Sequence, residues 1–251
     1  MTDIALEERR STLGESTVLW AGPEGVTVAP DRWLALSGAP SVEYNAALVH
    51  GDGGALDTTV EEVLAAGAPT VVMVAGQAGE KVSGLRDRDW IPIGNLALMQ
   101  LELSDWAPAT ARRARRLDLA DHPAVRELVG EVYGVGPGLA GVAIAGLIAG
   151  LDGHCLWGAF DPAGDLVSCL ATVRVRETVV VWSMATAVPA RRCGYGAAAL
   201  SAALTAAAQD GATSSLLSSS AAGEPLYRAL GYRELERWQQ WSRPRWVLAR
   251  K

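Results

Sequence analysis

The sequence predicts an α/β protein, with a mixed, mostly antiparallel central sheet flanked by helices and an additional N-terminal α/β unit. Two observations predict this fold. Between residues 18 and 103, apolar runs of strand length alternate with helical patterns. After His154, three strand-like runs follow one another through short turns, and a glycine-bearing loop then opens a helix rich in alanine and leucine.

The composition is that of a globular protein able to bury a core. Of the residues, 49% are hydrophobic and 20% are charged. A length of 251 residues is enough for one large domain or two small ones. A net charge of −6 argues against nucleic acid as a general partner. No run approaches the ~18 apolar residues that cross a bilayer, and the acidic segment Met1–Arg10 lacks the apolar core of a secretory signal. We therefore expect a cytoplasmic protein with no membrane partner.

The cysteines indicate a reduced protein. Cys155, Cys169 and Cys193 are odd in number and do not have the spacing of a metal site. We expect neither a structural disulfide nor a bound metal.

Residues 1–108 form the predicted N-terminal α/β unit. A capping-box pattern at Thr58–Glu61 predicts a helix that Gly67 ends, and a second short helix is expected around Glu80–Arg86. The expected strands are Val18–Trp20, Val26–Ala29, Val42–Val49, Thr70–Ala75 and Leu96–Leu103.

The segment Asp105–Arg116 marks the expected boundary, so that residues 109–251 form the second domain. The basic run Arg112–Arg116 is interpreted as a solvated face, with an anion or nucleic-acid contact as the alternative. A helix is expected from Asp121 through Val132 with Pro123 in its first turn, and a buried helix over Leu139–Leu151.

The last hundred residues give the clearest pattern. Expected strands at Cys155–Phe160, Leu166–Val175 and Val179–Val188 form a meander. A helix at Ala197–Gln209, a strand at Thr213–Ser219, a short helix beginning near Pro225 and a final strand at Arg233–Trp241 follow.

The loop between meander and helix carries the main functional signal. Residues 188–197 read Val-Pro-Ala-Arg-Arg-Cys-Gly-Tyr-Gly-Ala. A strand-to-helix junction directs unpaired backbone N–H groups and the positive end of a helix dipole at one spot, which suits a phosphate or pyrophosphate. A generic tight turn is the alternative for this loop taken alone.

A second segment, Tyr227–Tyr232, makes the pattern specific. Residues from about 110 to 245 resemble the Gcn5-related N-acetyltransferase (GNAT) superfamily. Its acyl-CoA loop, Arg/Gln-x-x-Gly-x-Gly/Ala, is matched by Arg191–Gly196, and its Tyr-x-x-Leu-Gly-Phe/Tyr element by Tyr227–Tyr232. The connection from Pro189 to Gly194 is shorter than the commonest form. The resemblance implies the acyl-CoA N-acyltransferase fold.

The resemblance also implies roles for particular residues. Tyr227 would protonate the leaving thiolate, and a backbone N–H on the last meander strand would contact the oxyanion. The co-substrate would be acetyl-CoA or another acyl-CoA, the acceptor an amine, and the activity that of an N-acetyltransferase. The alternative is a catalytically silent acyl-CoA-binding or regulatory module. Three groups of residues are expected to bind the donor. The backbone of Thr186, Ala187 and Val188 would pair with pantetheine, and Arg191 and Arg192 would supply cations. The pyrophosphate would be held by the backbone amides of Arg192, Cys193, Gly194, Tyr195, Gly196 and Ala197.

Two questions stay open at this stage. Glu224, Glu177 and His154 are candidates for a general base, but each is better interpreted as a structural residue.

The N-terminal unit faintly resembles a degenerate GNAT-like half-domain, with Leu85–Trp90 in the place of Leu-Gly-Tyr. Such a unit would cover the substrate side or form an interface, for example in a homodimer. An unrelated α/β cap is the alternative.

Overall fold

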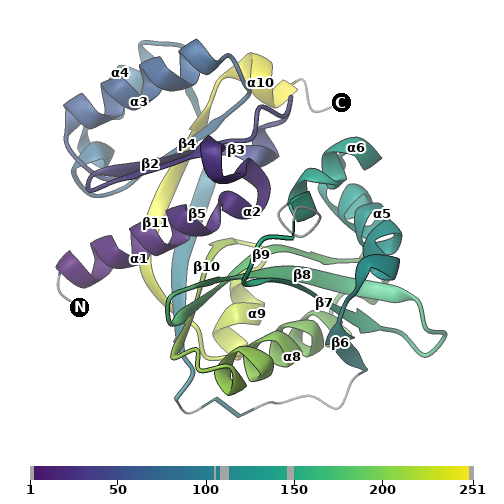
Figure 1. The fold of residues 1–251 in the computed structure, drawn as a ribbon. Helices are drawn as coiled ribbons and strands as arrows, with labels where there is room; N and C mark the ends of the chain where they lie inside the picture. Colours follow the sequence, from purple (N-terminus) through teal and green to yellow (C-terminus); the bar gives the residue numbers. More distant parts are fainter. Residues whose placement is uncertain (1–2, 105, 108–112, 146–149, 249–251) are drawn as a thin grey trace. The chain divides into compact units, whose positions relative to one another are not determined.

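The structure is a computed structural model that describes residues 3–104, 106–107, 113–145 and 150–248 (Figure 1). Contacts within the chain form two compact units. Unit 1 contains residues 1–99, 218–224 and 234–251, and unit 2 contains residues 100–217 and 225–233. This division differs from the expected one at 108/109, because the C-terminal strand pairs with a strand of the N-terminal segment: Gln239 lies opposite Val74 and Trp241 opposite Val72.

In unit 1 the strands lie in the order β1-β2-β3-β4-β11-β5. The first three form an antiparallel meander, β4 runs parallel to β3, and β11 runs antiparallel to β4. The elements are α1 (Asp3–Ser16), α2 (Val18–Ala21), β1 (Val26–Ala29), β2 (Arg32–Leu36), β3 (Asn45–Val49), α3 (Gly53–Ala66), β4 (Val71–Val74), α4 (Ser83–Arg86), β5 (Ile91–Glu102), β11 (Arg233–Ser242) and α10 (Pro244–Leu248). The 3-10 turns are η1 (Pro23–Gly25), η2 (Val42–Tyr44) and η3 (Gly76–Lys81).

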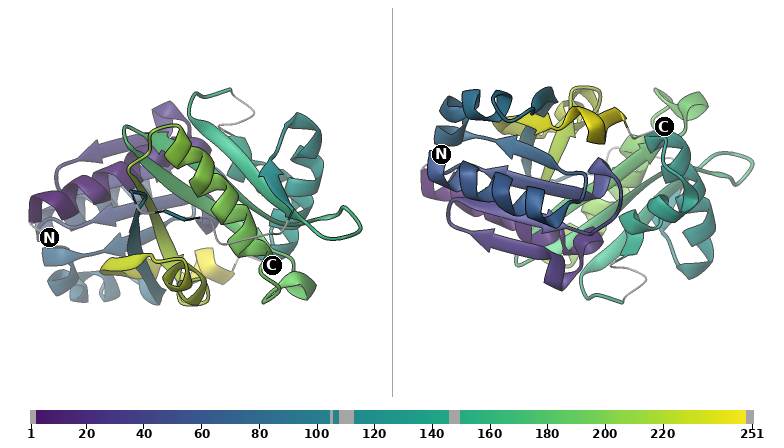
Figure 2. Two further views of the ribbon diagram at one scale, coloured as in Figure 1. Left: turned by 90° about the horizontal axis from the view of Figure 1, so that it is seen from below. Right: turned by 90° about the horizontal axis from the view of Figure 1, so that it is seen from above.

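In unit 2 the strands lie in the order β10-β9-β8-β7-β6. Strands β6 to β9 are antiparallel, and β10 runs parallel to β9 after the α8 crossover. Helices α5 and α8 cover opposite faces of this sheet (Figures 1 and 2). The elements are β6 (Ala114–Arg116), η4 (Leu119–Asp121), α5 (His122–Tyr133), α6 (Pro137–Ala140), η5 (Val142–Ile144), β7 (His154–Phe160), β8 (Leu166–Val175), β9 (Thr178–Thr186), η6 (Val188–Ala190), α8 (Tyr195–Gln209), β10 (Ser214–Ser220) and α9 (Glu224–Ala229).

The mixed sheet and the meander confirm the predicted fold class, but several local predictions were wrong. The run Val18–Trp20 is helical, because a short apolar run fits a buried helix as well as a strand. The expected strand from Val42 begins at Asn45, after a 3-10 turn. In place of one helix over Leu139–Leu151 the chain forms α6 and η5; residues 146–149 of that prediction, and residues 105 and 108–112 of the expected boundary, lie outside the described residues.

Helix α3 begins earlier than its apparent capping box. Asp52 is the N-cap, with Oδ1 accepting from the amides of Gly54 at 2.9 Å and Ala55 at 3.1 Å. The Thr58 and Thr59 hydroxyls instead donate to the carbonyls of Gly54 and Ala55, one turn back in the helix. Gly67 ends the helix in the left-handed conformation, as predicted.

We expect replacement of Asp52 by alanine to destabilise unit 1. The amides of Gly54 and Ala55 would lose the carboxylate as their hydrogen-bond acceptor. This loss should lower the free energy of unfolding by about 1 kcal/mol. Urea unfolding of Asp52→Ala measures this loss. Asp52→Asn is the matched control, because its side-chain oxygen still caps the helix; equal losses in both variants would contradict the capping role.

Candidate functional site

The centre of the site is the diverging pair β9 and β10. Among the described residues their parallel register covers only Thr178–Val180 opposite Ser214–Leu216. Strand β9 continues to Thr186, with β8 still paired on its other side. The edge of β9 from Val181 onward therefore offers backbone groups to an extended ligand, as an exposed sheet edge does to a peptide.

A β-bulge interrupts β9 in this stretch. Ala171 of β8 lies opposite Trp182 and Cys169 lies opposite Ala185, so β9 carries one more residue than β8 between these pairs. Ser183 takes a positive φ of 51°, a conformation that is uncommon for a non-glycine residue. Bulges re-aim side chains, and this one lies where β9 leaves β10.

The loop after β9 leads directly into α8. The η6 turn brings Arg191 back over the strand, where its Nε donates to the Thr186 carbonyl at 3.1 Å. Arg192 and Gly194 both have positive φ, 61° and 84°, so the chain turns sharply before the helix begins at Tyr195. Gly194 provides no side-chain cap. The first-turn amides of α8 thus have no intrahelical acceptor and form an anion-binding end.

Gly196 is closely packed on the side where a side chain would project. A Cβ at this position would lie 3.1 Å from Met184 Cε, 3.3 Å from Thr186 Oγ1 and 3.4 Å from Leu226 Cδ2. The first turn of α8 therefore packs against the end of β9 and against α9. The expected strand to Val188 ends at Thr186, and the expected helix from Ala197 begins two residues earlier.

The backbone at residues 186–188 is largely used by the protein itself. The Ala187 amide donates to Val167 O at 3.0 Å, and the Ala187 carbonyl accepts from the Ala190 amide at 2.9 Å. The Thr186 carbonyl accepts from Arg191, as described above. The free strand edge consequently lies earlier in β9 than the pantetheine-pairing residues Thr186, Ala187 and Val188 expected from the sequence.

Tyr227 lies on α9 and is 8% exposed. Its hydroxyl donates to Met184 Sδ at 3.3 Å, and its ring packs edge-on against Tyr232 with centroids 5.7 Å apart. Burial raises the pKa of the Tyr227 phenol to about 12, so the group is protonated at neutral pH. Met184 thus links Tyr227 to Gly196, which brings together the two sequence motifs.

The proposed bases have structural roles or lie in exposed turns. Both oxygens of Glu224 accept from Arg237, at 2.8 and 3.0 Å. His154 is buried, and its Nδ1 lies 2.9 Å from the Asp152 carbonyl. Glu177 is exposed in the turn between β8 and β9. Within the described ranges no group of His, Cys, Asp and Glu side chains has the arrangement of a metal site, and the cysteine of the loop, Cys193, is exposed.

Unit 1 contains a similar strand–helix junction that the sequence analysis missed. Parallel strands β3 and β4 flank α3; Gly51 precedes the N-cap of the helix, and Gly53 and Gly54 are its first two residues. The difference is Asp52, whose carboxylate already occupies the N-terminal amides. The run Gly-Asp-Gly-Gly directly after a strand was the signal that could have revealed this junction.

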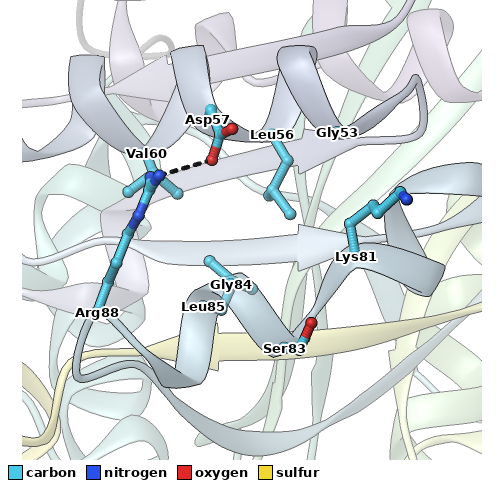
Figure 3. A pocket seen from close by; sticks show the side chains of 9 residues that line it. All are labelled: Gly53, Leu56, Asp57, Val60, Lys81, Ser83, Gly84, Leu85 and Arg88. Carbon is cyan, nitrogen blue, oxygen red and sulfur yellow. Dashed lines mark ion pairs between the residues drawn. The ribbon is translucent and has the colours of Figure 1, made fainter.

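A pocket of about 290 Å³ lies beside that junction, between α3 and α4 (Figure 3). Leu56 and Val60 line the α3 side, and Leu85 lines the α4 side. Arg88 reaches across to Asp57 with a 2.9 Å ion pair, while Lys81 lies near Gly53 (Figure 3). A carboxylate at the helix end and an ion pair across the opening do not favour a polyanionic ligand here.

Comparisons with known proteins identify the family. The sequence model of the Acetyltransferase (GNAT) family matches residues 102–232. No curated protein sequence matches the chain, and no helix in the described part is long and apolar enough to cross a membrane.

Solved structures extend the likeness in fold to both units. A GCN5-related N-acetyltransferase from Kribbella flavida is 17% identical, with a TM-score of 0.63 over 92% of this chain and 96% of that one. A GCN5-related N-acetyltransferase from Sphaerobacter thermophilus is 15% identical, with a TM-score of 0.61 over 94% and 93%. The family match covers more than half of the sequence, and the chain belongs to the GNAT acetyltransferase family.

Proposed function

We propose that the protein transfers an acetyl group from acetyl-CoA to a primary amine by direct attack, with Tyr227 as the general acid. The observation that carries this proposal is the buried phenol of Tyr227, whose hydroxyl donates to Met184 near the end of β9, while Met184 itself packs against the first turn of α8. Family membership supports the acetyltransferase class, and the site supports the roles of individual residues.

The donor would lie along β9 and end at α8. Its pyrophosphate would accept hydrogen bonds from the amides of Arg192 to Ala197, with the Arg192 guanidinium as the added cation. Arg191 holds the end of β9 through the Thr186 carbonyl, so we assign it to the loop's shape. The pantetheine amides would pair with β9 between Val181 and Thr186, where β10 has diverged.

The chemistry follows from this placement. The neutral amine nitrogen attacks the thioester carbonyl carbon, and the oxyanion that forms would accept a hydrogen bond from a backbone N–H of β9. When the tetrahedral intermediate collapses, the C–S bond breaks and the sulfur takes the proton of the Tyr227 hydroxyl. The surplus proton of the amine leaves to water, and water returns a proton to Tyr227. No carboxylate or histidine is needed to balance these steps.

We expect the reaction to keep its general acid at alkaline pH. A phenol is active as an acid while protonated, which holds below its pKa of about 12. The value of kcat/KM should therefore not fall between about pH 7 and about pH 10, and should rise where the amine loses its proton. A pH–rate profile measures this. A falling limb near pH 10, the ordinary pKa of tyrosine, would contradict the assigned environment of Tyr227.

Titration calorimetry with acetyl-CoA tests the function itself. We expect one donor per chain, because Asp52 occupies the corresponding helix end in unit 1. Thiol release in a screen of amines then separates an enzyme from the alternative, a silent acyl-CoA-binding module. No binding of acetyl-CoA would contradict both, and binding without thiol release for any amine class would favour the module. Sedimentation velocity in the same buffer tests the homodimer expected from the sequence.

A further inference from the structure

Met184 is the residue at which the parts of the site meet. Its carbonyl accepts a hydrogen bond from the Tyr133 hydroxyl of α5 at 3.1 Å. Its sulfur accepts from the Tyr227 hydroxyl of α9 at 3.3 Å. Its methyl group lies where a Cβ on Gly196 of α8 would come within 3.1 Å. One residue of β9 therefore contacts three helices of the site.

The bulge is what gives Met184 this position. In a regular strand Trp182 and Met184 would share a face. The extra residue at Ser183 shifts the alternation, so that Trp182 and Ala185 share one face while Met184 and Thr186 share the other. Both Met184 and Thr186 lie against Gly196, which agrees with this reading. The hydrogen bond from Tyr133 fixes the peptide group of Met184 from the α5 side.

A thioether is an unusual partner for a buried phenol. It is a weak acceptor, whereas a carboxylate or carbonyl would hold the proton firmly. A buried hydroxyl without any partner is costly, so the weak acceptor stabilises the free protein. A competing acceptor can also replace the thioether readily. The thiolate that leaves a thioester is such a competitor, because its charged sulfur is a much stronger hydrogen-bond acceptor than a thioether.

We propose that Met184 is a positioning residue: its sulfur accepts the hydrogen bond of the Tyr227 hydroxyl in the free protein, and the donor sulfur replaces it as the acceptor in the complex. This inference rests on the proposed function, because the displacing sulfur is that of acetyl-CoA. The hydrogen bond from Tyr227 Oη to Met184 Sδ breaks when acetyl-CoA binds, and a hydrogen bond from Tyr227 Oη to the donor sulfur forms. This second hydrogen bond strengthens as the sulfur leaves as a thiolate. The phenol thus stays satisfied in both states.

A double-mutant cycle tests the proposal. Met184→Leu keeps the side-chain volume and removes the acceptor. We expect it to lower the equilibrium constant for folding about fivefold more in the presence of the Tyr227 hydroxyl than in the Tyr227→Phe background. We also expect it to tighten acetyl-CoA binding about fivefold in the native background, since no internal bond is then broken, and to leave affinity unchanged in the Tyr227→Phe background.

Two further measurements test whether the acceptor at residue 184 and the donor sulfur compete for the Tyr227 hydroxyl. Met184→Gln supplies a stronger acceptor, so it should weaken acetyl-CoA binding where Tyr227 is present and not in the Tyr227→Phe background. An acetyl-CoA analogue with a methylene group in place of sulfur should bind wild type and Met184→Leu alike. Equal effects of each Met184 substitution in both backgrounds would overturn the inference and leave Met184 a packing residue. Failure of wild type to bind acetyl-CoA would instead contradict the proposed function.

Discussion

We expect Tyr227→Phe to lower kcat for acyl transfer by about 10²- to 10⁴-fold, the range that general-acid catalysis contributes. The substitution removes only the hydroxyl, so the ring keeps its edge-on contact with Tyr232 and α9 keeps its packing. Affinity for acetyl-CoA should change little, because in the proposed complex backbone groups of α8 and β9 would hold the pyrophosphate and the pantetheine. Steady-state kinetics together with calorimetry separates the two effects.

Tyr232→Phe is the matched control. Tyr232 is also buried, and its hydroxyl shares a 2.6 Å hydrogen bond with Ser215 Oγ. Loss of that hydroxyl should reduce the free energy of unfolding by about 1 kcal/mol while kcat stays close to that of the wild type. Unchanged turnover in Tyr227→Phe, or an equal loss of turnover in both variants, would refute the acid role of Tyr227.

The strands of unit 2 were predictable because each is continuous in sequence and bounded by its own turn. The hairpin turn at Asp161–Asp165, for example, is closed by hydrogen bonds from the Gly164 and Asp165 amides to the Asp161 side chain. Helix boundaries were less predictable. Thr58-Thr59-Val60-Glu61 has the residue types of a capping box, yet it lies inside α3, since Asp52 competes for the start of the helix.

The parts of the site that depend on pairing between strands could not be read from the sequence. The bulge at Ser183 is a difference in register between β8 and β9, and neither strand alone shows it. The same holds for Met184, which has no motif and becomes significant only through its contacts. By contrast, Tyr227 and Gly196 belong to short motifs whose residue types are fixed by local chemistry, and the structure brings these two together.

The two strand–helix junctions show how one residue changes the chemistry of the same local geometry. Gly194 starts α8 without a side-chain cap, so no carboxylate of the cap competes with an anion at this end of the helix. Asp52 starts α3 with a carboxylate that takes two of the equivalent amides. A bound phosphate would have to displace this carboxylate and approach its negative charge, so we assign donor binding to unit 2.

We expect Arg10→Met to reduce the free energy of unfolding by about 3 kcal/mol, the lower end of the cost of leaving a buried ion without its partner, because the Glu236 side chain is 15% exposed. Arg10 is 8% exposed, and its Nε donates to Glu236 Oε2 at 2.9 Å while its Nη2 bonds the other carboxylate oxygen. Trp238 Nε1 also donates to Oε2, at 2.6 Å. This pair connects α1 to β11 across 226 positions of the chain. Methionine fills the aliphatic volume but leaves the Glu236 carboxylate with one neutral donor.

Arg88→Met is the control for that experiment, because its ion pair with Asp57 joins side chains that are 42% and 59% exposed. Such a pair contributes at most about 1 kcal/mol.

His50 supplies a second readout: burial and then the Arg10 charge lower the pKa of its imidazole. Removing Arg10 should raise that pKa, which NMR titration measures. Adding Glu236→Gln should recover part of the lost stability, since the amide still accepts from Trp238 and no longer carries a charge. Equal losses in Arg10→Met and Arg88→Met would contradict a buried ion pair between α1 and β11.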